Sequence, residues 1–175
     1  MTFNANVLSA RKRTDRDAAA PIHLVLSDVD GVLTDGRIVF DNRGVETKSF
    51  HVRDGLGIKR WEQCGFQFGI LTARNSEIVR IRAAELGLTL VRQGFEDKWP
   101  AALEMMQQCG VSPEQCAYIG DDLPDIPVMR RVALAACPCD AAQDTLDAAH
   151  WILRRGGGQG CVRELLERLL RATGR

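Results

Sequence analysis

The sequence lacks an excess of charge of either sign, and it lacks any long apolar run. Its 23 Lys and Arg residues balance 23 Asp and Glu residues, so the formal net charge is zero. Nucleic-acid-binding modules normally carry a basic excess or a basic patch, so we expect no nucleic-acid partner. No apolar run approaches the roughly 20 residues that span a bilayer, so we expect no membrane segment.

Signals of export and of a disulfide framework are also missing. Near the N-terminus the charged residues follow a short apolar stretch, which reverses the order found in a secretory signal. The six cysteines are scattered along the chain, as is typical of reduced thiols. Cys137 and Cys139 stand close together, but no second Cys or His pair follows at the spacing of a zinc site. We therefore expect a cytoplasmic protein.

The sequence does contain a regular alternation of short apolar runs and helical patterns. The runs predict strands at 22–26, 68–71, 88–91, 117–119, 132–135 and 151–153. Helical patterns fall between them at 55–64, 76–86, 98–109, 124–131 and 141–149, and an amphipathic segment follows at 162–170. The alternation predicts one α/β domain with a doubly wound, mostly parallel sheet of Rossmann-like form.

Two segments depart from this alternation. Residues 1–20 are polar and aperiodic, and we expect them to form a flexible N-terminal tail before a domain over 21–175. Residues 36–40 and 45–52 are typical of two strands joined by a turn at 41–44, which predicts a small β-hairpin inserted after the first strand. In open α/β sheets ligands bind beyond the carboxyl ends of the strands, so the hairpin is expected beside the ligand site.

Acidic residues follow two of the predicted strands. Asp28 and Asp30 come directly after the first one, and in extended backbone their side chains point to the same side. Their mutual repulsion favours a proton or a cation between them, and Mg²⁺ prefers such oxygen ligands. Asp121, Asp122 and Asp125 follow a later strand, and helix capping alone would explain the last two. Two acidic loops at the ends of parallel strands would nevertheless converge on one site.

Two further residues extend this candidate site. Thr72 follows the predicted strand at 68–71, where its hydroxyl and the backbone N–H groups of a helix start form a phosphate cradle. Asn75 or Ser76 could instead simply cap that helix. Lys98 precedes another helix, and a single lysine is usually solvated. Beside a metal ion, a hydroxyl and carboxylates, however, it becomes a phosphate anchor.

These residues resemble, in order, the four motifs of the haloacid dehalogenase superfamily: Asp28-Val29-Asp30-Gly31-Val32, Thr72, Lys98 and Gly120-Asp121-Asp122. The short intervals between the motifs leave no room for a large cap domain. Within the superfamily the chain resembles the capless 3-deoxy-D-manno-octulosonate 8-phosphate phosphatases, over roughly residues 22–170.

The resemblance implies a Mg²⁺-dependent phosphatase that works through an aspartyl-phosphate. Asp28 would be the nucleophile, and Asp30 would act as acid and then as base. Asp28, the backbone carbonyl of Asp30 and Asp121 would hold Mg²⁺. Thr72 and Lys98 would hold the transferring phosphoryl group and stabilise its developing charge.

The substrate and the assembly are implied in the same way. The substrate would be the 8-phosphate of an eight-carbon keto sugar acid used for lipopolysaccharide, with Asp30, Lys98, Arg53 and Arg74 in contact with it. Arg53 could instead pair within its own loop, and Arg74 could contact another subunit. Family members form homotetramers through their hairpins, with a C-terminal strip closing a neighbour's site. The glycine-rich residues 156–160 fit such a mobile strip.

One departure from the family pattern leaves the substrate open. This chain has Gln159 where the family usually has Arg, and the loss of that cation removes a contact suited to a carboxylate or a phosphate. An alternative substrate is therefore a nine-carbon keto sugar acid 9-phosphate, of the nononate or N-acylneuraminate type. A non-catalytic binding module is an alternative of another class, and the presence of Asp28, Asp30 and Lys98 disfavours it.

Overall fold

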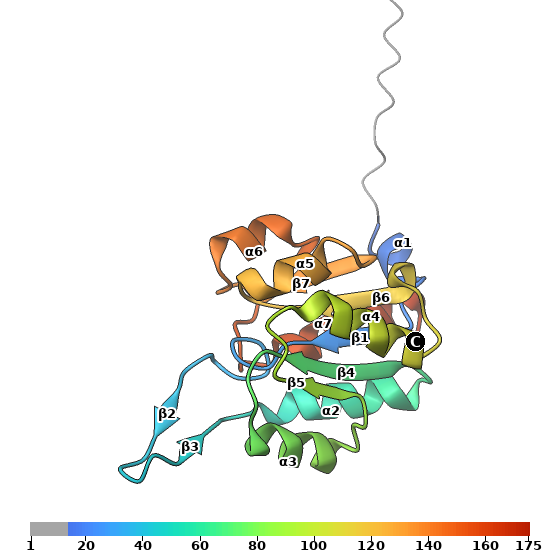
Figure 1. Ribbon diagram of the computed structural model, residues 1–175. Coiled ribbons are helices and arrows are strands. Elements are labelled where there is room, and N and C mark those ends of the chain that lie inside the picture. Colours follow the sequence, from blue (N-terminus) through green and yellow to red (C-terminus); the bar gives the residue numbers. More distant parts are fainter. Residues whose placement is uncertain (1–13) are drawn as a thin grey trace, which may run out of the picture.

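A six-stranded parallel sheet forms the centre of the computed structural model, which describes residues 14–175 (Figure 1). Its strands lie in the order β5-β4-β1-β6-β7-β8. Their bounds are β1 (Leu24–Ser27), β4 (Gln67–Thr72), β5 (Val91–Gln93), β6 (Cys116–Ile119), β7 (Leu134–Cys137) and β8 (Trp151–Ile152). The expected α/β class with a doubly wound parallel sheet is confirmed.

Helices cover both faces of the sheet, and each face has its own apolar cluster. One cluster packs under α1 (Asp15–Ala19), α2 (Val52–Gln63), α3 (Glu77–Leu86) and α7 (Cys161–Thr173). The other packs under α4 (Lys98–Gln108), α5 (Ile126–Met129) and α6 (Gln143–Ala148). In β1, Val25 belongs to the first cluster while Leu24 and Leu26 belong to the second. Successive strand residues face opposite sides, so a strand covered on both faces is apolar throughout.

The register of the three central strands positions the site. Ser27 of β1 is paired with Ile70 of β4 and with Ile119 of β6. The residues that follow these positions therefore leave the sheet at the same edge, beyond the carboxyl ends of the strands. Two short 3₁₀ helices lie on either side of β6, η1 (Pro113–Gln115) and η2 (Leu123–Asp125). The acidic loop that follows β6 leads directly into η2.

The expected hairpin after the first strand is present and projects from the body of the molecule (Figure 1). Its strands, β2 (Val39–Phe40) and β3 (Glu46–Thr47), are antiparallel and shorter than predicted. The apolar side chains along the hairpin are half exposed or more. The short ladder is therefore not stabilised by packing of these side chains against other segments. The turn is held by the carboxylate of Asp41, which accepts hydrogen bonds from the backbone N–H groups of Arg43 and Val45.

Two other predicted boundaries are wrong. The strand expected at 88–91 lies at 91–93, because Leu88 and Leu90 are buried without belonging to the ladder of β5. The apolar character of Leu88 and Leu90 therefore reflects their burial and does not indicate that they pair with a neighbouring strand. The helix expected at 124–131 is divided into η2 and the four-residue α5, with Pro124 and Pro127 near their starts. Proline lacks the N–H that a helix interior needs, so it favours such positions.

Part of the segment expected as a flexible N-terminal tail, residues 1–20, is helical. Residues 1–13 lie outside the described residues, but residues 15–19 form α1, which packs against α7. Thr14 and Asp17 form a capping box at the start of this helix. Ala18 and Ala19 are buried, and Asp15 accepts two hydrogen bonds of 2.7 Å from Arg168 of α7. A five-residue helix is too short to show a period in the sequence.

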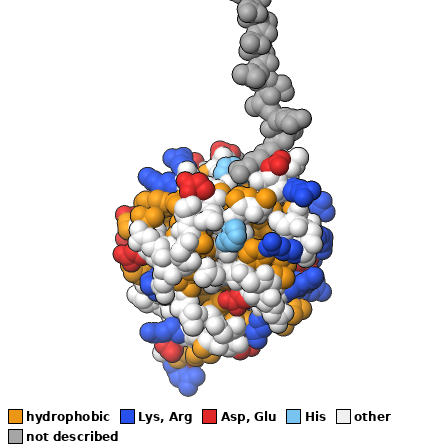
Figure 2. All heavy atoms as spheres, turned by 90° about the vertical axis from the view of Figure 1, so that its right-hand side faces the viewer, with side chains coloured by type: hydrophobic (Ala, Val, Ile, Leu, Met, Phe, Trp, Pro, Cys, Tyr) orange, Lys and Arg blue, Asp and Glu red, His pale blue; other side chains and the backbone are white. Residues whose placement is uncertain are grey.

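The end of the molecule that carries α1 lies opposite the hairpin, and Figure 2 shows it face on. Acidic, basic and apolar side chains are interspersed on this face, with Lys and Arg more frequent toward its right-hand margin. No helix within residues 14–175 is both long enough and apolar enough to cross a membrane.

Substitution at Ala19 tests whether α1 belongs to the folded domain. Ala19 is 2% exposed, so Ala19→Asp buries a carboxylate without a partner and lowers the free energy of unfolding by at least about 2 kcal/mol. Ala20→Asp is the matched control, because Ala20 is exposed and the acid costs at most about 1 kcal/mol at a helix C-terminus. Urea unfolding measures both. Equal effects of the two substitutions would show that α1 contributes nothing to the core.

Candidate active site

The ends of the central strands bring four of the predicted site residues together. Asp28 directly follows β1, Thr72 is the last residue of β4, and Asp121 follows β6 after one glycine. Lys98 begins α4, and its ammonium lies 2.8 Å from Oδ2 of Asp28. Thr72 is 2% exposed, and its hydroxyl oxygen accepts a hydrogen bond of 3.4 Å from the backbone N–H of Arg74.

Lys98 is a buried cation and not a solvated surface lysine. Its side chain is 1% exposed, and its ammonium contacts Asp125 Oδ1 at 2.6 Å in addition to Asp28. Burial lowers the pKa of an ammonium, but the two carboxylates outweigh it, so the pKa of Lys98 is raised. The side chain therefore stays charged inside the protein and supplies a fixed positive charge beside Asp28.

Asp125 orders the acidic loop. Oδ1 accepts hydrogen bonds of 2.6 Å from Lys98 and from the hydroxyl of Tyr118, and Oδ2 accepts from the backbone N–H groups of Asp121 and Asp122. Four donors saturate a fully buried carboxylate. Sequence reasoning did not single out Tyr118, whose hydroxyl lies in an otherwise apolar strand. The Asp122 side chain accepts from the N–H of Leu123 and caps η2.

The donor set at the end of the sheet fits a divalent cation. Carboxylate oxygens of Asp28, Asp121 and Asp125 lie within 4.8 Å of one another. Because Asp125 is already saturated, Asp28 and Asp121 provide the free oxygens. Burial and the charges of Asp28 and Asp125 raise the pKa of Asp121 to about 8. Burial and the charge of Asp125 also raise the pKa of Asp28 to about 6, although Lys98 opposes them. A hard cation such as Mg²⁺ relieves this repulsion.

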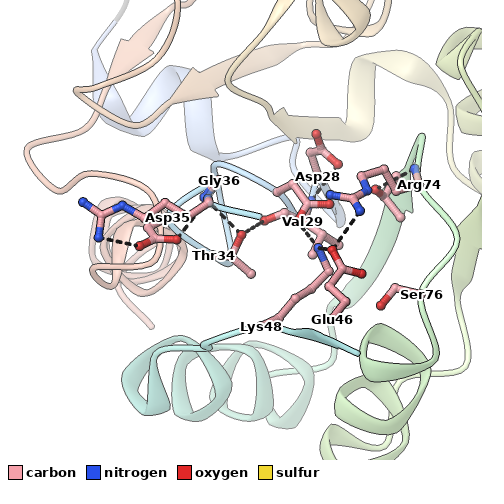
Figure 3. A network of polar contacts seen from close by, with 12 residues as sticks. Asp28, Val29, Thr34, Asp35, Gly36, Glu46, Lys48, Arg74 and Ser76 are labelled. Carbon is pink, nitrogen blue, oxygen red and sulfur yellow. Dashed lines mark hydrogen bonds and ion pairs between the residues drawn. The ribbon is translucent and has the colours of Figure 1, made fainter. Parts of the chain in front are cut away.

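Asp30 lies next to this cluster, but its side chain is not one of the clustered donors. Its Oδ1 accepts a hydrogen bond from the ammonium of Lys48, which comes from the hairpin (Figure 3). Lys48 also lies 3.6 Å from Glu46, and Glu46 accepts a hydrogen bond of 2.8 Å from Arg74. Sequence reasoning placed the hairpin beside the site but did not select Lys48 and Glu46. Their alternation along a strand that borders the site was the available signal.

Arg53 does not lie with the other predicted substrate contacts. It is exposed at the start of α2 and lines a surface groove of about 1240 Å³ together with residues of β8 and α7. None of the clustered carboxylates lines this groove. A contact between Arg53 and the substrate therefore stays a prediction.

Residues 156–160, the glycine-rich strip, dock on their own chain, and the expected contact of this strip with a neighbouring subunit stays a prediction. The N–H of Gly158 donates to the carbonyl of Val32 at 2.9 Å, and the N–H of Gly157 donates to Asp140 Oδ1 at 2.9 Å. A Cβ at Gly157 would overlap the carbonyl of Gly31. Glycine thus lets the strip lie directly against the loop that carries Asp30. Gln159 is exposed.

A buried lysine paired with the carboxylate that follows β1, with a second acid two residues further on, is typical of a haloacid dehalogenase-type phosphoryl-transfer enzyme without a large cap. No protein-family model matches the chain. The 3-deoxy-D-manno-octulosonate 8-phosphate phosphatase KdsC of Haemophilus influenzae is 42% identical over 154 residues, which cover 88% of this chain and 86% of the relative. The chain belongs to this phosphatase family.

Solved structures agree with this assignment. The phosphatase of Yersinia pestis has a TM-score of 0.89 and 42% identity, and the match covers 91% of this chain and 86% of that one. The phosphatase of Moraxella catarrhalis has a TM-score of 0.89 and 38% identity, with 91% and 92% covered. The Moraxella crystal contains a magnesium ion, a phosphate ion and a KDO molecule.

Gly31 provides a test of the geometry around Asp121. Its φ is +85°, and a Cβ at this position would overlap the Asp121 carboxylate. We expect Gly31→Ala to weaken Mg²⁺ binding by at least about tenfold, since a displaced ligand costs that much affinity. Gly65→Ala is the matched control, with φ of +86° and nothing within 4 Å of the added Cβ.

Both alanine variants carry the same backbone strain, of about 1–2 kcal/mol. Urea unfolding measures the effect of this strain on stability, and calorimetric titration with Mg²⁺ measures the loss of a metal ligand. The two measurements therefore separate the two effects. Unchanged Mg²⁺ affinity in Gly31→Ala would show that Asp121 does not bind the ion.

Proton release provides a second test of the same site. The raised pKa of Asp121, about 8, means that this carboxyl group holds a proton near pH 7 when no cation is bound. A bound cation requires the carboxylate form, so Mg²⁺ binding near pH 7 should release about one proton. The affinity for Mg²⁺ should therefore rise with pH up to the pKa of Asp121, and the release of a proton on Mg²⁺ binding should disappear near pH 9.5. Calorimetry in two buffers of different ionisation enthalpy counts the protons, and a count of zero near pH 7 would contradict the assignment.

Proposed function

We propose that this chain is a Mg²⁺-dependent phosphatase that hydrolyses 3-deoxy-D-manno-octulosonate 8-phosphate to the free sugar acid and phosphate, on the route to lipopolysaccharide. The observation that carries the proposal is the buried pair of Asp28 and Lys98 beside Asp121, in a chain that belongs to the family with this activity. We also place the enzyme in the cytoplasm, where thiols stay reduced, and the six cysteines are free.

Asp28 is the proposed nucleophile. Its Oδ1 accepts a hydrogen bond of 2.6 Å from the N–H of Val29, and its Oδ2 pairs with Lys98, so the carboxylate is held in one orientation. In the first half-reaction an Asp28 oxygen bonds to phosphorus and the bond from phosphorus to the sugar oxygen breaks. Asp30 gives its proton to that sugar oxygen.

The second half-reaction releases the phosphate. A water molecule attacks phosphorus, Asp30 takes its proton, and the bond between phosphorus and Asp28 breaks. Lys98 and the hydroxyl of Thr72 hold the phosphoryl oxygens through both steps. When Mg²⁺ is held by Asp28, Asp121 and the carbonyl of Asp30, it neutralises charge on those oxygens.

The rest of the substrate is recognised beyond the phosphate. Arg74 comes from the loop after β4, and its side chain is 38% exposed on the border of the site, where it pairs with Glu46. This position suits contact with the sugar or with its carboxylate. Arg53 is proposed as a second contact, and its exposure at the start of α2 leaves it accessible.

We further propose a homotetramer in which the hairpins pack together. Four apolar side chains of the hairpin region are at least half exposed: Ile38, Val39, Phe40 and Val45. Several exposed apolar side chains on one projecting hairpin are typical of a contact between subunits. Closure of each site by a neighbouring subunit, through its C-terminal strip, is part of the proposal.

Phosphate release from a panel of phosphorylated sugar acids tests the activity. We expect the eight-carbon 8-phosphate to react fastest, with Mg²⁺ required and chelator abolishing turnover. Asp28→Asn should lose activity by at least about 10⁴-fold, because an amide cannot form the acyl phosphate. Asp122→Asn is the matched control, since Asp122 only caps η2.

If the enzyme prefers a nine-carbon 9-phosphate, the proposed chemistry stands and the proposed substrate changes. Gln159 is then the first residue to exchange. The curated relatives favour the eight-carbon compound. Absence of release from every member of the panel by the folded protein would overturn the enzyme assignment and favour the binding module.

A further inference from the structure

The hairpin places a buried lysine against the proposed acid and base. Lys48 lies one residue beyond β3, and although that segment projects into solvent, the side chain of Lys48 is 1% exposed. Its ammonium contacts Oδ1 of Asp30 and lies 3.6 Å from Oε1 of Glu46. Figure 3 shows Lys48 and Glu46 pointing from the hairpin toward the loop that follows β1.

The contact belongs to a row of four alternating charges. Arg74, from the loop after β4, lies 2.8 Å from Glu46, which lies beside Lys48, which contacts Asp30. Residues 46 and 48 lie on the same face of an extended segment, so both reach the site. A buried ammonium is stable only with carboxylates around it, and Lys48 has two. The row therefore joins three segments that are separate in the sequence.

Asp30 has no other fixed partner among the described residues. Its side chain is 20% exposed, and its carboxylate contacts Lys48 through Oδ1. Oδ2 has no hydrogen-bond or ion-pair partner among the described residues, so it remains available to a ligand. The next residue, Gly31, has a positive φ, so the backbone turns immediately after Asp30 and provides no further hold on its side chain.

We propose that Lys48 is a positioning residue for the reaction, which holds Oδ1 of Asp30 so that Oδ2 faces the oxygen of the leaving group. This inference rests on the proposed function, because it assigns Lys48 to the acid and base of that reaction. A proton is transferred efficiently only between groups held in hydrogen-bond geometry, and displacement by about 1 Å can cost about 10²-fold in rate. Lys48 acts through Asp30 and need not touch the phosphoryl group.

The inference predicts that substitution of Lys48 lowers the reaction rate by a factor that depends on the leaving group. A sugar alkoxide needs a proton from Asp30 as it leaves, whereas p-nitrophenolate leaves without one. In Lys48→Met we therefore expect the single-turnover rate with the sugar acid phosphate to fall by about 30- to 100-fold. The pre-steady-state burst of p-nitrophenolate from p-nitrophenyl phosphate should stay within about threefold of wild type, and KM for the sugar acid phosphate should change little.

Two further variants accompany Lys48→Met. Lys59→Met is the matched control, since Lys59 is an exposed lysine of α2, and it should behave as wild type with both substrates. Glu46→Gln removes the second carboxylate from Lys48 and leaves Asp30 intact, so it should show the same dependence on the leaving group with a smaller loss. Thermal unfolding shows whether Lys48→Met folds. If it does not fold, Glu46→Gln still tests the inference.

The outcomes separate the inference from the proposed function. Equal loss with both substrates would overturn the inference and make Lys48 a structural or phosphate-binding residue. No loss with either substrate would overturn it as well. Failure of the wild-type enzyme with every sugar acid phosphate would instead overturn the proposed function, and the inference with it.

Discussion

Lys98 lies between Asp28 and Asp125, at 2.8 Å and 2.6 Å, with almost no exposure to water. A cation in this position is stable only if both carboxylates remain ionised and close, and the carboxylates are stable only if the cation is present. The three residues come from the start of α4, the end of β1 and the end of η2. The interaction thus requires that α4 and η2 be packed correctly beside the central strand β1 before any chemistry is possible.

Around this interaction the loops are held by contacts that leave little room for change. Lys98, Tyr118 and two backbone N–H groups saturate Asp125, and these bonds order the acidic loop that presents Asp121. On the other side of the site, the strip at 156–160 lies against the loop that carries Asp30, and glycines make this approach possible. Asp28, the proposed nucleophile, is held by Lys98 in the core, whereas Asp30, the proposed acid and base, is held by Lys48 of the hairpin. In the proposed reaction, binding of the phosphoryl group and transfer of the proton therefore depend on different parts of the molecule.

Much of the site could be predicted because its residues stand at strand ends. An apolar run followed by acids marks Asp28 and Asp121, and parallel strands bring such ends together. The same reasoning missed Tyr118, which has no local signal of function, and Lys48, whose only signal was its alternation with Glu46. It also missed α1 and did not show that the strip at 156–160 docks on its own chain. A five-residue helix shows no period, and a run of glycines permits either mobility or close docking, so composition alone does not separate the two.

The sequence by itself determined the class of fold, most of the order of its strands and helices, and the candidate residues of the site, since each follows from local periodicity and from motifs at strand ends. The tertiary structure decided which charges meet. Lys98 pairs with Asp28 and Asp125, and Lys48 with Asp30, across intervals that no local pattern spans. The physical reason is that the energy of an ion pair depends on distance and on burial, and both are set only when separate segments pack against one another.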